Sequence, residues 1–187
     1  MQNPRLASRY AKSILDLAIE KDQLEKVYQD MLFLDQVVKS SREFNNMLDS
    51  PVIASDKKDK VISAITSGKI SSMTDSFLKL LVVKNREINL QQIISSFINQ
   101  YKQKKDIHTV ILTTAVPLHE DVKNKIIEQV KKTSNMKNIE LKTIIDPSII
   151  GGFILQTGDK LVDASISYDL KEISREFENN DFIYKVR

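Results

Sequence analysis

Few side chains in this sequence of 187 residues have the types and spacing that chemistry would need. Asp163 and Ser165 lie two positions apart, a spacing that places a carboxylate and a hydroxyl on the same face of a strand. An acid and a nucleophile of this kind need a base, and none accompanies the pair. We therefore expect Asp163 and Ser165 to meet water or a partner rather than a substrate.

The other candidate groups are equally sparse. The two histidines, His108 and His119, have no second ligand at helical or hairpin spacing, so we predict surface or helix-start positions rather than a metal site. Cysteine is absent, which excludes thiolate zinc sites and cysteine nucleophiles. No phosphate-binding loop occurs, and Gly151-Gly152 does not open a helix after a strand. The sequence therefore predicts a non-enzyme without metal or cofactor.

The stretch from Asp146 to Leu170, which contains Asp163 and Ser165, carries three of the four glycines. Gly151 and Gly152 allow a positive φ or a close approach of two backbones just before an apolar run. A β-hairpin is expected to follow, with strands over 153–157 and 161–166 and a tight turn at Gly158-Asp159.

Two details of this hairpin are predicted. Asp159 is expected to shape the turn by accepting hydrogen bonds from nearby backbone. In the second strand, Val162, Ala164 and Ile166 share one face, and Leu161, Asp163 and Ser165 share the other. We expect one face to be core and the face with the carboxylate and hydroxyl to be available to water or a partner.

Residues 3–105 show helical periodicity throughout and no alternating strand pattern. Six helices are predicted, with starts near Asn3-Pro4, Gln23, Ser41, Ser55 or Asp56, Ser71 or Ser72, and Leu90. Their short connections predict a compact six-helix bundle over residues 1–105.

The pattern changes near residue 106. Strands are predicted over 109–116 and 139–145, with a helix between them after Pro117. The hairpin follows, and a last helix begins at Ser167 or Asp169. This order predicts a small α+β domain over residues 106–187, so the whole chain is expected to be of the α+β class.

Two of the predicted helices carry more apolar surface than one seam of a bundle needs. In the first, Leu15 and Ile19 widen the apolar face, and in the fifth, Phe77–Val83 is apolar except for Lys79. We expect such a helix to be buried on more than one side. Side by side, the two helices would form a groove for an amphipathic partner helix. The alternative is that both are central core helices, and periodicity alone leaves both interpretations open.

Composition excludes several protein classes. The net charge of +3, which is the sum of +4 in the first 106 residues and −1 in the remainder, is too small to indicate a nucleic-acid-binding protein. An RNA-binding module ranks last among the alternatives, and steep salt dependence of nucleic-acid binding would be its sign. Apolar runs are far shorter than the roughly 20 residues of a membrane span, so we expect a soluble chain that could still serve a membrane complex.

Three segments, in order along the chain, resemble the δ subunit family of F-type ATP synthases, which includes the mitochondrial oligomycin-sensitivity-conferring protein. The C-terminal signature is Gly151-Gly152-Phe-Ile, Gly158-Asp159 and Asp163-x-Ser165. The first-helix motif is Ala7-Ser-Arg9-Tyr10-Ala11, and the fifth-helix motif is Phe77–Val82 followed by Lys84-Asn85-Arg86. The chain departs from the family pattern at Ala164, where glycine is frequent, and at Ile166-Ser167-Tyr168.

The resemblance implies a non-catalytic stator subunit. In that family, the N-terminal domain binds the N-terminal helix of an α subunit between its first and fifth helices, and the C-terminal domain holds the b subunits of the peripheral stalk. Carried to this sequence, the residues that would face the α-subunit helix are Leu6, Tyr10, Ala11, Ile14, Leu78, Leu81 and Val82. The hairpin signature comprises Gly151, Gly152, Gly158, Asp159, Asp163 and Ser165. Arg86 is expected to anchor the end of the fifth helix.

The resemblance further implies a place in the ATP synthase on the cytoplasmic face of the cell membrane, without nucleotide, metal or cofactor. The absence of a visible transit peptide favours a bacterial protein, but a processed organellar form would have much the same sequence features, so the origin stays open. The alternative function is a free-standing adaptor that captures amphipathic helices, against which the hairpin signature argues. The sequence leaves open the coupling ion, the composition of the stalk and the oligomeric state of the isolated protein.

Overall fold

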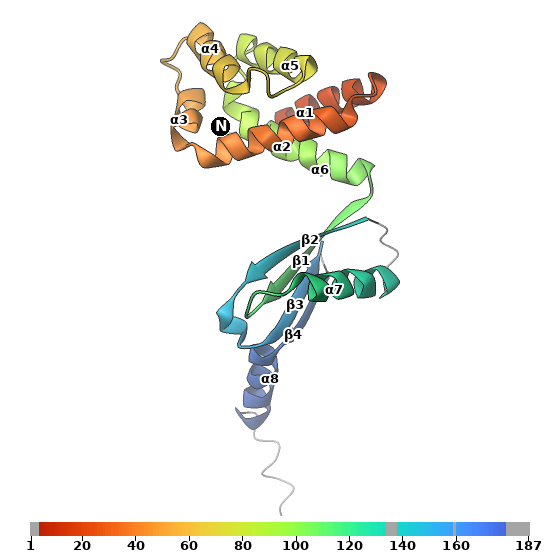
Figure 1. The fold of residues 1–187 in the computed structure, drawn as a ribbon. Helices are drawn as coiled ribbons and strands as arrows, with labels where there is room; N and C mark the ends of the chain where they lie inside the picture. Colours follow the sequence, from red (N-terminus) through yellow and green to blue (C-terminus); the bar gives the residue numbers. More distant parts are fainter. Residues whose placement is uncertain (1–3, 134–137, 159, 179–187) are drawn as a thin grey trace, which may run out of the picture. The chain divides into compact units, whose positions relative to one another are not determined.

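The computed structural model describes residues 4–133, 138–158 and 160–178, which form helices and one four-stranded sheet (Figure 1). The chain divides into two compact units, Met1–Lys104 and Lys105–Arg187. The first unit contains α1 (Pro4–Glu20), α2 (Leu24–Ser40), α3 (Arg42–Asp49), α4 (Ser55–Thr66), α5 (Ser72–Val83), the 3-10 turn η1 (Glu87–Asn89) and α6 (Leu90–Lys104). The second contains β1 (Ile107–Thr114), α7 (Glu120–Thr133), β2 (Asn138–Ile145), η2 (Pro147–Ile149), β3 (Gly152–Thr157), β4 (Lys160–Ser165) and α8 (Ile166–Glu178). The mixed helical and sheet class is therefore as predicted.

Several helices begin where the sequence places a capping serine. The Ser41 hydroxyl accepts a hydrogen bond from the backbone N–H of Phe44 at 3.1 Å, and Ser71 does the same for Thr74 at 3.4 Å. These bonds satisfy backbone donors that the first turns of α3 and α5 leave unpaired. The predicted starts of these two helices are confirmed.

The core of the first unit is built around α6, which packs against α1 and α2. Ile93, Ile94 and Phe97 on α6 are fully buried. On the facing side, α1 contributes the small buried residues Ala7 and Ala11, which let the two helix backbones approach closely. The amphipathic pattern of α6 thus determines which face of α1 is covered.

A buried ion pair joins α4 to η1 in the same unit. The Lys58 ammonium lies 2.7 Å from a Glu87 carboxylate oxygen, and both side chains are almost fully buried. Lys58 also donates to the backbone carbonyl of Leu48 at 2.8 Å, at the end of α3. One lysine therefore ties together three segments that are far apart in the sequence.

The sheet has the strand order β2-β1-β3-β4. β1 and β2 are parallel, so the chain between them needs a crossover, which α7 supplies while packing against β2. β3 pairs antiparallel with both β1 and β4. In the central strand β1, burial alternates, with Val110, Leu112 and Thr114 inward.

Gly152 makes the hairpin possible. It has a φ of +73°, and a Cβ built there would lie 2.1 Å from the backbone oxygen of Ala164 in β4. Gly152 thus combines the two properties predicted for this pair of glycines, a positive φ and a close approach of two backbones. Gly151 adopts no positive φ and lies beside the Ile166 side chain. Gly158 occupies the turn with a φ of +55°, and Asp159 lies outside the described residues.

The prediction for the two faces of β4 was wrong in part. Val162 and Ala164 are exposed, Ile166 begins α8 instead of ending the strand, and Ser165 on the supposedly open face is buried. The physical reason is that β4 is an edge strand. The helix α7 packs against β2 at the opposite edge of the sheet, so it does not bury the side chains of β4.

Among the described residues, none of the helices combines the length and the apolar character that a membrane span requires.

Candidate functional site

An apolar groove of about 560 Å³ lies between α1 and α5. Its lining consists of Tyr10, Ser13, Ile14 and Leu17 from α1, and Met73, Ser76, Phe77 and Leu80 from α5. Leu17 and Leu80 are 43% and 47% exposed, although each lies on an otherwise well-packed helix. Contiguous exposed apolar side chains on neighbouring helices are typical of a surface that binds a partner.

In the structure, the predicted helix-binding residues lie in three places: the groove, an adjoining pocket and the core. Tyr10 and Ile14 line the groove, and Leu6 lies in an adjoining pocket that shares Tyr10 and Ser13 with the groove. Four other predicted residues, Ala11, Leu78, Leu81 and Val82, are no more than 3% exposed and belong to the core of the unit. Their burial contradicts the expectation that they face a partner. On α5, the groove is lined instead by Met73, Phe77 and Leu80.

The periodicity of α5 explains this replacement. Thr74, Leu78 and Leu81 follow helical spacing and point into the unit, and Val82 extends that face. Met73, Phe77 and Leu80 have the same spacing one position earlier, so they form a neighbouring stripe that the unit covers only in part, with Met73 and Phe77 half-buried and Leu80 exposed. The run 77–83 is thus buried on one side only, and Val83 is 75% exposed.

A buried carboxylate on α2 fixes the N-terminus of α5. One oxygen of Asp30 accepts hydrogen bonds from the Ser71 backbone N–H at 2.9 Å, the Ser71 hydroxyl at 2.6 Å and the Thr74 hydroxyl at 2.7 Å. A negative charge at this position also interacts favourably with the helix dipole. Asp30 was not identified from the sequence, because its partners are more than 40 positions away.

The C-terminus of α5 is closed by a Schellman motif. Asn85 has a φ of +53°, its N–H donates to the Val82 carbonyl at 3.0 Å, and the Arg86 N–H donates to the Leu81 carbonyl at 2.8 Å. The Ser55 hydroxyl holds the Asn85 side chain from α4 at 3.2 Å. Arg86 therefore anchors the helix end through its backbone.

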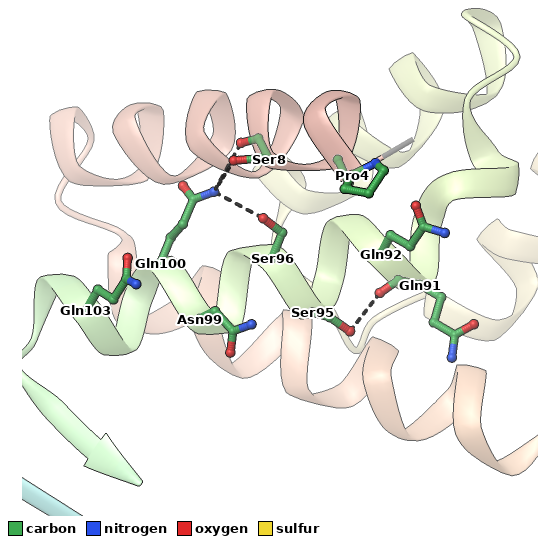
Figure 2. Close-up of a pocket in the computed structure, with 10 residues that line it drawn as sticks. Pro4, Ser8, Gln91, Gln92, Ser95, Ser96, Asn99, Gln100 and Gln103 are labelled. Carbon is green, nitrogen blue, oxygen red and sulfur yellow. Dashed lines mark hydrogen bonds between the residues drawn. The ribbon is translucent and has the colours of Figure 1, made fainter. Parts of the chain in front are cut away.

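A second surface hollow, of about 640 Å³, lies between α1 and α6 and is lined by uncharged polar side chains (Figure 2). The Gln100 amide donates to the carbonyl and hydroxyl of Ser8 at 3.1 and 3.3 Å and to the Ser96 hydroxyl at 3.1 Å. Figure 2 shows this side chain reaching from α6 to α1. The Gln100 side chain therefore joins α6 to α1 across this hollow.

Asp163 and Ser165 are engaged with backbone. The Ser165 N–H donates to an Asp163 carboxylate oxygen at 2.9 Å, and the Ser165 hydroxyl accepts from the Tyr168 N–H at 3.2 Å. The first bond forms a turn at the end of β4, and the second caps α8. This pair of the hairpin signature therefore shapes a strand–helix junction.

The two histidines belong to the second unit, one in β1 and one just before α7. His108 Nε2 lies 3.0 Å from a carboxylate oxygen of Asp106, and exposed His119 directly precedes α7. The described part of the chain holds no group of three or more residues that could ligate a metal.

The second unit also exposes large apolar side chains. On α8, Leu170, Ile173 and Phe177 are 52%, 48% and 75% exposed. On the sheet, Phe153 and Val162 are also exposed. Leu170, Ile173 and Phe177 follow helical spacing, so α8 presents an apolar stripe that the described residues leave exposed.

The comparisons with known proteins agree with this organisation. The family model described as "ATP synthase delta (OSCP) subunit" matches residues 6–177. The ATP synthase subunit delta of Christiangramia forsetii is 34% identical over 186 residues, covering 100% of both chains. That of Cytophaga hutchinsonii is 35% identical over 177 residues, covering 95% of this chain and 96% of its own.

A solved structure gives the same assignment. A chain in the cryo-EM structure of the Toxoplasma gondii mitochondrial ATP synthase hexamer is similar with a TM-score of 0.69 and 25% identity, covering 92% of this chain and 97% of that one. The match over nearly the whole length includes both units. Together with the family model, it shows that this chain belongs to the ATP synthase delta (OSCP) subunit family.

Proposed function

We propose that this chain links the catalytic head of an F-type ATP synthase to its peripheral stalk, with the α1/α5 groove binding the N-terminal helix of an α subunit. The observation that carries the proposal is the apolar groove itself, which remains open on a unit whose core is otherwise closed. Family members are non-catalytic subunits of this complex.

The dimensions and chemistry of the groove suit a helix. Leu17 and Ile14 on one wall and Phe77 and Leu80 on the other present apolar side chains at helical spacing. A partner helix with a stripe at i, i+3, i+4 and i+7 would bury these side chains, each gaining about 1.5–3 kcal/mol on full burial. Ser13 and Ser76 leave room between the larger residues.

The second unit is the part that we propose binds the b subunits of the stalk. Leu170, Ile173 and Phe177 form an exposed apolar stripe on α8, and the sheet adds Phe153 and Val162. Helical stalk subunits would cover such surfaces by packing of apolar faces. The complex would then lie on the cytoplasmic face of the membrane, with this chain attached only through its partners.

A stator must hold the catalytic head while the central rotor turns. The link therefore has to resist torque, and we expect nanomolar affinity or better, about 12 kcal/mol. An apolar groove on a preformed unit supplies such affinity without nucleotide, metal or cofactor. The two units let one chain contact the head and the stalk through separate surfaces.

The proposal is tested by calorimetric titration of the full chain with a peptide of the N-terminal helix of the matching α subunit. We expect one-to-one submicromolar binding that is lost in Leu17→Asp and in Leu80→Asp, because each places a charge in the groove. Both residues are substantially exposed, so the variants should fold. Val61→Asp on α4, which is 41% exposed and outside the groove, is the matched control.

Failure of the folded wild-type chain to bind this peptide would contradict the groove assignment. Binding unchanged in both Asp variants would place the helix elsewhere on the chain. A free-standing adaptor would instead fail to co-purify with a membrane ATPase while still binding amphipathic helices.

A further inference from the structure

The apolar groove adjoins a pocket of different chemistry. This pocket, of about 380 Å³, is lined by Leu6, Arg9, Tyr10, Ser13 and Arg86. Tyr10 and Ser13 also line the groove, so the two hollows are continuous along α1. Two guanidinium groups therefore stand where the apolar lining ends.

The two arginines have their charges available. Within the described residues, no carboxylate forms an ion pair with Arg9 or Arg86, and both side chains are exposed. Glu87, the carboxylate next to Arg86 in sequence, is buried and paired with Lys58. The acid nearest to Arg86 in sequence is therefore engaged by Lys58, and the pocket lined by the two arginines is basic.

The Arg86 side chain is also not needed to end α5. The Schellman motif uses the backbone N–H of Arg86, and the side chain of Asn85 is held by Ser55. A guanidinium that is placed by its backbone but unused by the fold is suited to contact another molecule. Arginine in particular binds carboxylates through two parallel hydrogen bonds.

We propose that Arg9 and Arg86 form a carboxylate-binding end of the groove, which receives an acidic side chain of the docked helix. This inference rests on the proposed function, because the groove must first hold an amphipathic helix. The helix would place its apolar stripe against Phe77 and Leu80 and its carboxylate between the two guanidinium groups. Charge complementarity at one end would then fix the register and direction of the helix, which an apolar groove alone does not specify.

Charges further along the groove agree with a fixed direction. Lys84 continues the groove stripe of α5 beyond Leu80 by helical spacing, which adds positive charge near Arg86. On α1, the basic Arg9 and Lys12 are followed by the acidic Asp16 and Glu20. A helix with the reverse distribution of charge would match only one orientation.

The test uses titrations of the full chain with the α-subunit helix peptide at low ionic strength. Because ion pairs near a surface are individually weak, we expect Arg9→Gln and Arg86→Gln each to lower the affinity about threefold, and the double variant about tenfold. The difference from wild type should disappear near 1 M salt, where the Debye length is about 3 Å. Arg42→Gln, an exposed arginine on α3 away from the pocket, should leave the affinity unchanged.

A double-mutant cycle identifies the contact. Each Asp or Glu of the peptide is changed to its amide in turn, and we expect one such change to weaken binding to wild type but not to the double arginine variant. Arg86→Lys should recover part of the affinity, since it keeps the charge but not the two-pronged geometry. Additive effects for every peptide carboxylate, or a helix without an acidic residue, would overturn the proposal.

The outcomes separate the two proposals. Loss of binding in Leu80→Asp together with unchanged affinity in the double arginine variant would retain the groove and overturn the carboxylate site. A double variant that loses affinity for acetate but not for the peptide would reduce the pocket to a site for free anions. No peptide binding by the wild-type chain would overturn both proposals.

Discussion

The two units differ in how much of their apolar surface they bury themselves. In the first unit, α6 is surrounded by buried side chains of α1 and α2, and the exposed apolar residues include Leu17 and Leu80, which line the groove on α1 and α5. In the second unit, the described residues provide only Val110, Leu112 and Ile149 as buried hydrophobic side chains. Large apolar side chains are instead exposed on both the sheet and α8.

This difference shows two ways of preparing a binding surface. The first unit is stabilised by its own core, so its groove is preformed and binding should cost little ordering entropy. The second unit is left with an incomplete core, so a partner that covers its apolar surface contributes to its stability. The following predictions test whether the two units are indeed stabilised separately and by different means.

The largest effect is expected for Lys58→Met. Removal of the lysine leaves the Glu87 carboxylate buried without its counter-charge, and we expect a loss of about 3–5 kcal/mol in the unfolding free energy of the first unit. Amide NMR spectra during denaturant unfolding would report each unit separately. Lys57→Met, at the neighbouring exposed lysine, is the control, and simultaneous unfolding of both units would contradict their independence.

A smaller effect, confined to the second unit, is expected for Gly152→Ala. The new methyl group would strain a φ of +73° and collide with the Ala164 carbonyl, so β3 and β4 must separate at a cost of about 3 kcal/mol. Gly158→Ala, with a φ of +55° and open space, should cost only about 1 kcal/mol. Hydrogen exchange of the hairpin amides would measure both, and equal effects would argue against the close approach at Gly152.

Asp30→Asn should loosen one wall of the groove without unfolding the unit. The amide keeps the shape but loses the charge that accepts three hydrogen bonds at the start of α5, and we expect a loss of about 1–3 kcal/mol. Exchange should accelerate most in the first turn of α5. Asp35→Asn, which breaks only an exposed pair with Lys39, should cost less than about 0.5 kcal/mol.

The smallest effect at neutral pH is expected for Tyr101→Phe. Burial, together with the hydrogen bond from the Tyr101 hydroxyl to Glu25 at 2.6 Å, raises the pKa of Tyr101 above its ordinary value. Because the pKa is raised in the folded state, the contribution of this hydroxyl to the free energy of unfolding is fully present below about pH 10, the pKa of tyrosine in the unfolded chain. The contribution decreases as the pH rises from there towards the folded-state pKa.

The variant should lose about 1 kcal/mol at pH 7 and show a weaker decrease in stability above pH 10. Circular dichroism melts across this range would measure the difference. An unchanged pH dependence would show that other groups govern alkaline unfolding.

Local features of the fold were predictable from the sequence. Ser41 and Ser71 indicated helix starts through capping chemistry, and Gly152 indicated a close backbone approach. These features depend on neighbouring residues, which a sequence displays directly. The wide apolar face of α1 that carries Tyr10 and Ile14 was also visible in the sequence, but periodicity alone left open whether α1 and α5 form a groove or belong to the core.

The lining of the groove on α5 was not predictable to the residue. Leu78 and Leu80 are the same amino acid two positions apart, yet one is buried and the other is 47% exposed. Which stripe points inward depends on the rotation of the helix, and that is fixed by Asp30 and by Asn85 with Ser55, all distant in sequence from their partners. Periodicity identifies apolar stripes but does not rank two neighbouring ones.

The short connection between the units has a mechanical consequence. Only Lys105 and Asp106 separate α6 from β1, and the Lys105 carbonyl is already bound by the Asn138 side chain of β2 at 3.0 Å. β1 is an inner strand of the sheet, held by parallel hydrogen bonds to β2 and by antiparallel hydrogen bonds to β3. Tension applied along the chain would therefore act in shear on many backbone hydrogen bonds at once. It would not break them one after another, as it would at an edge strand.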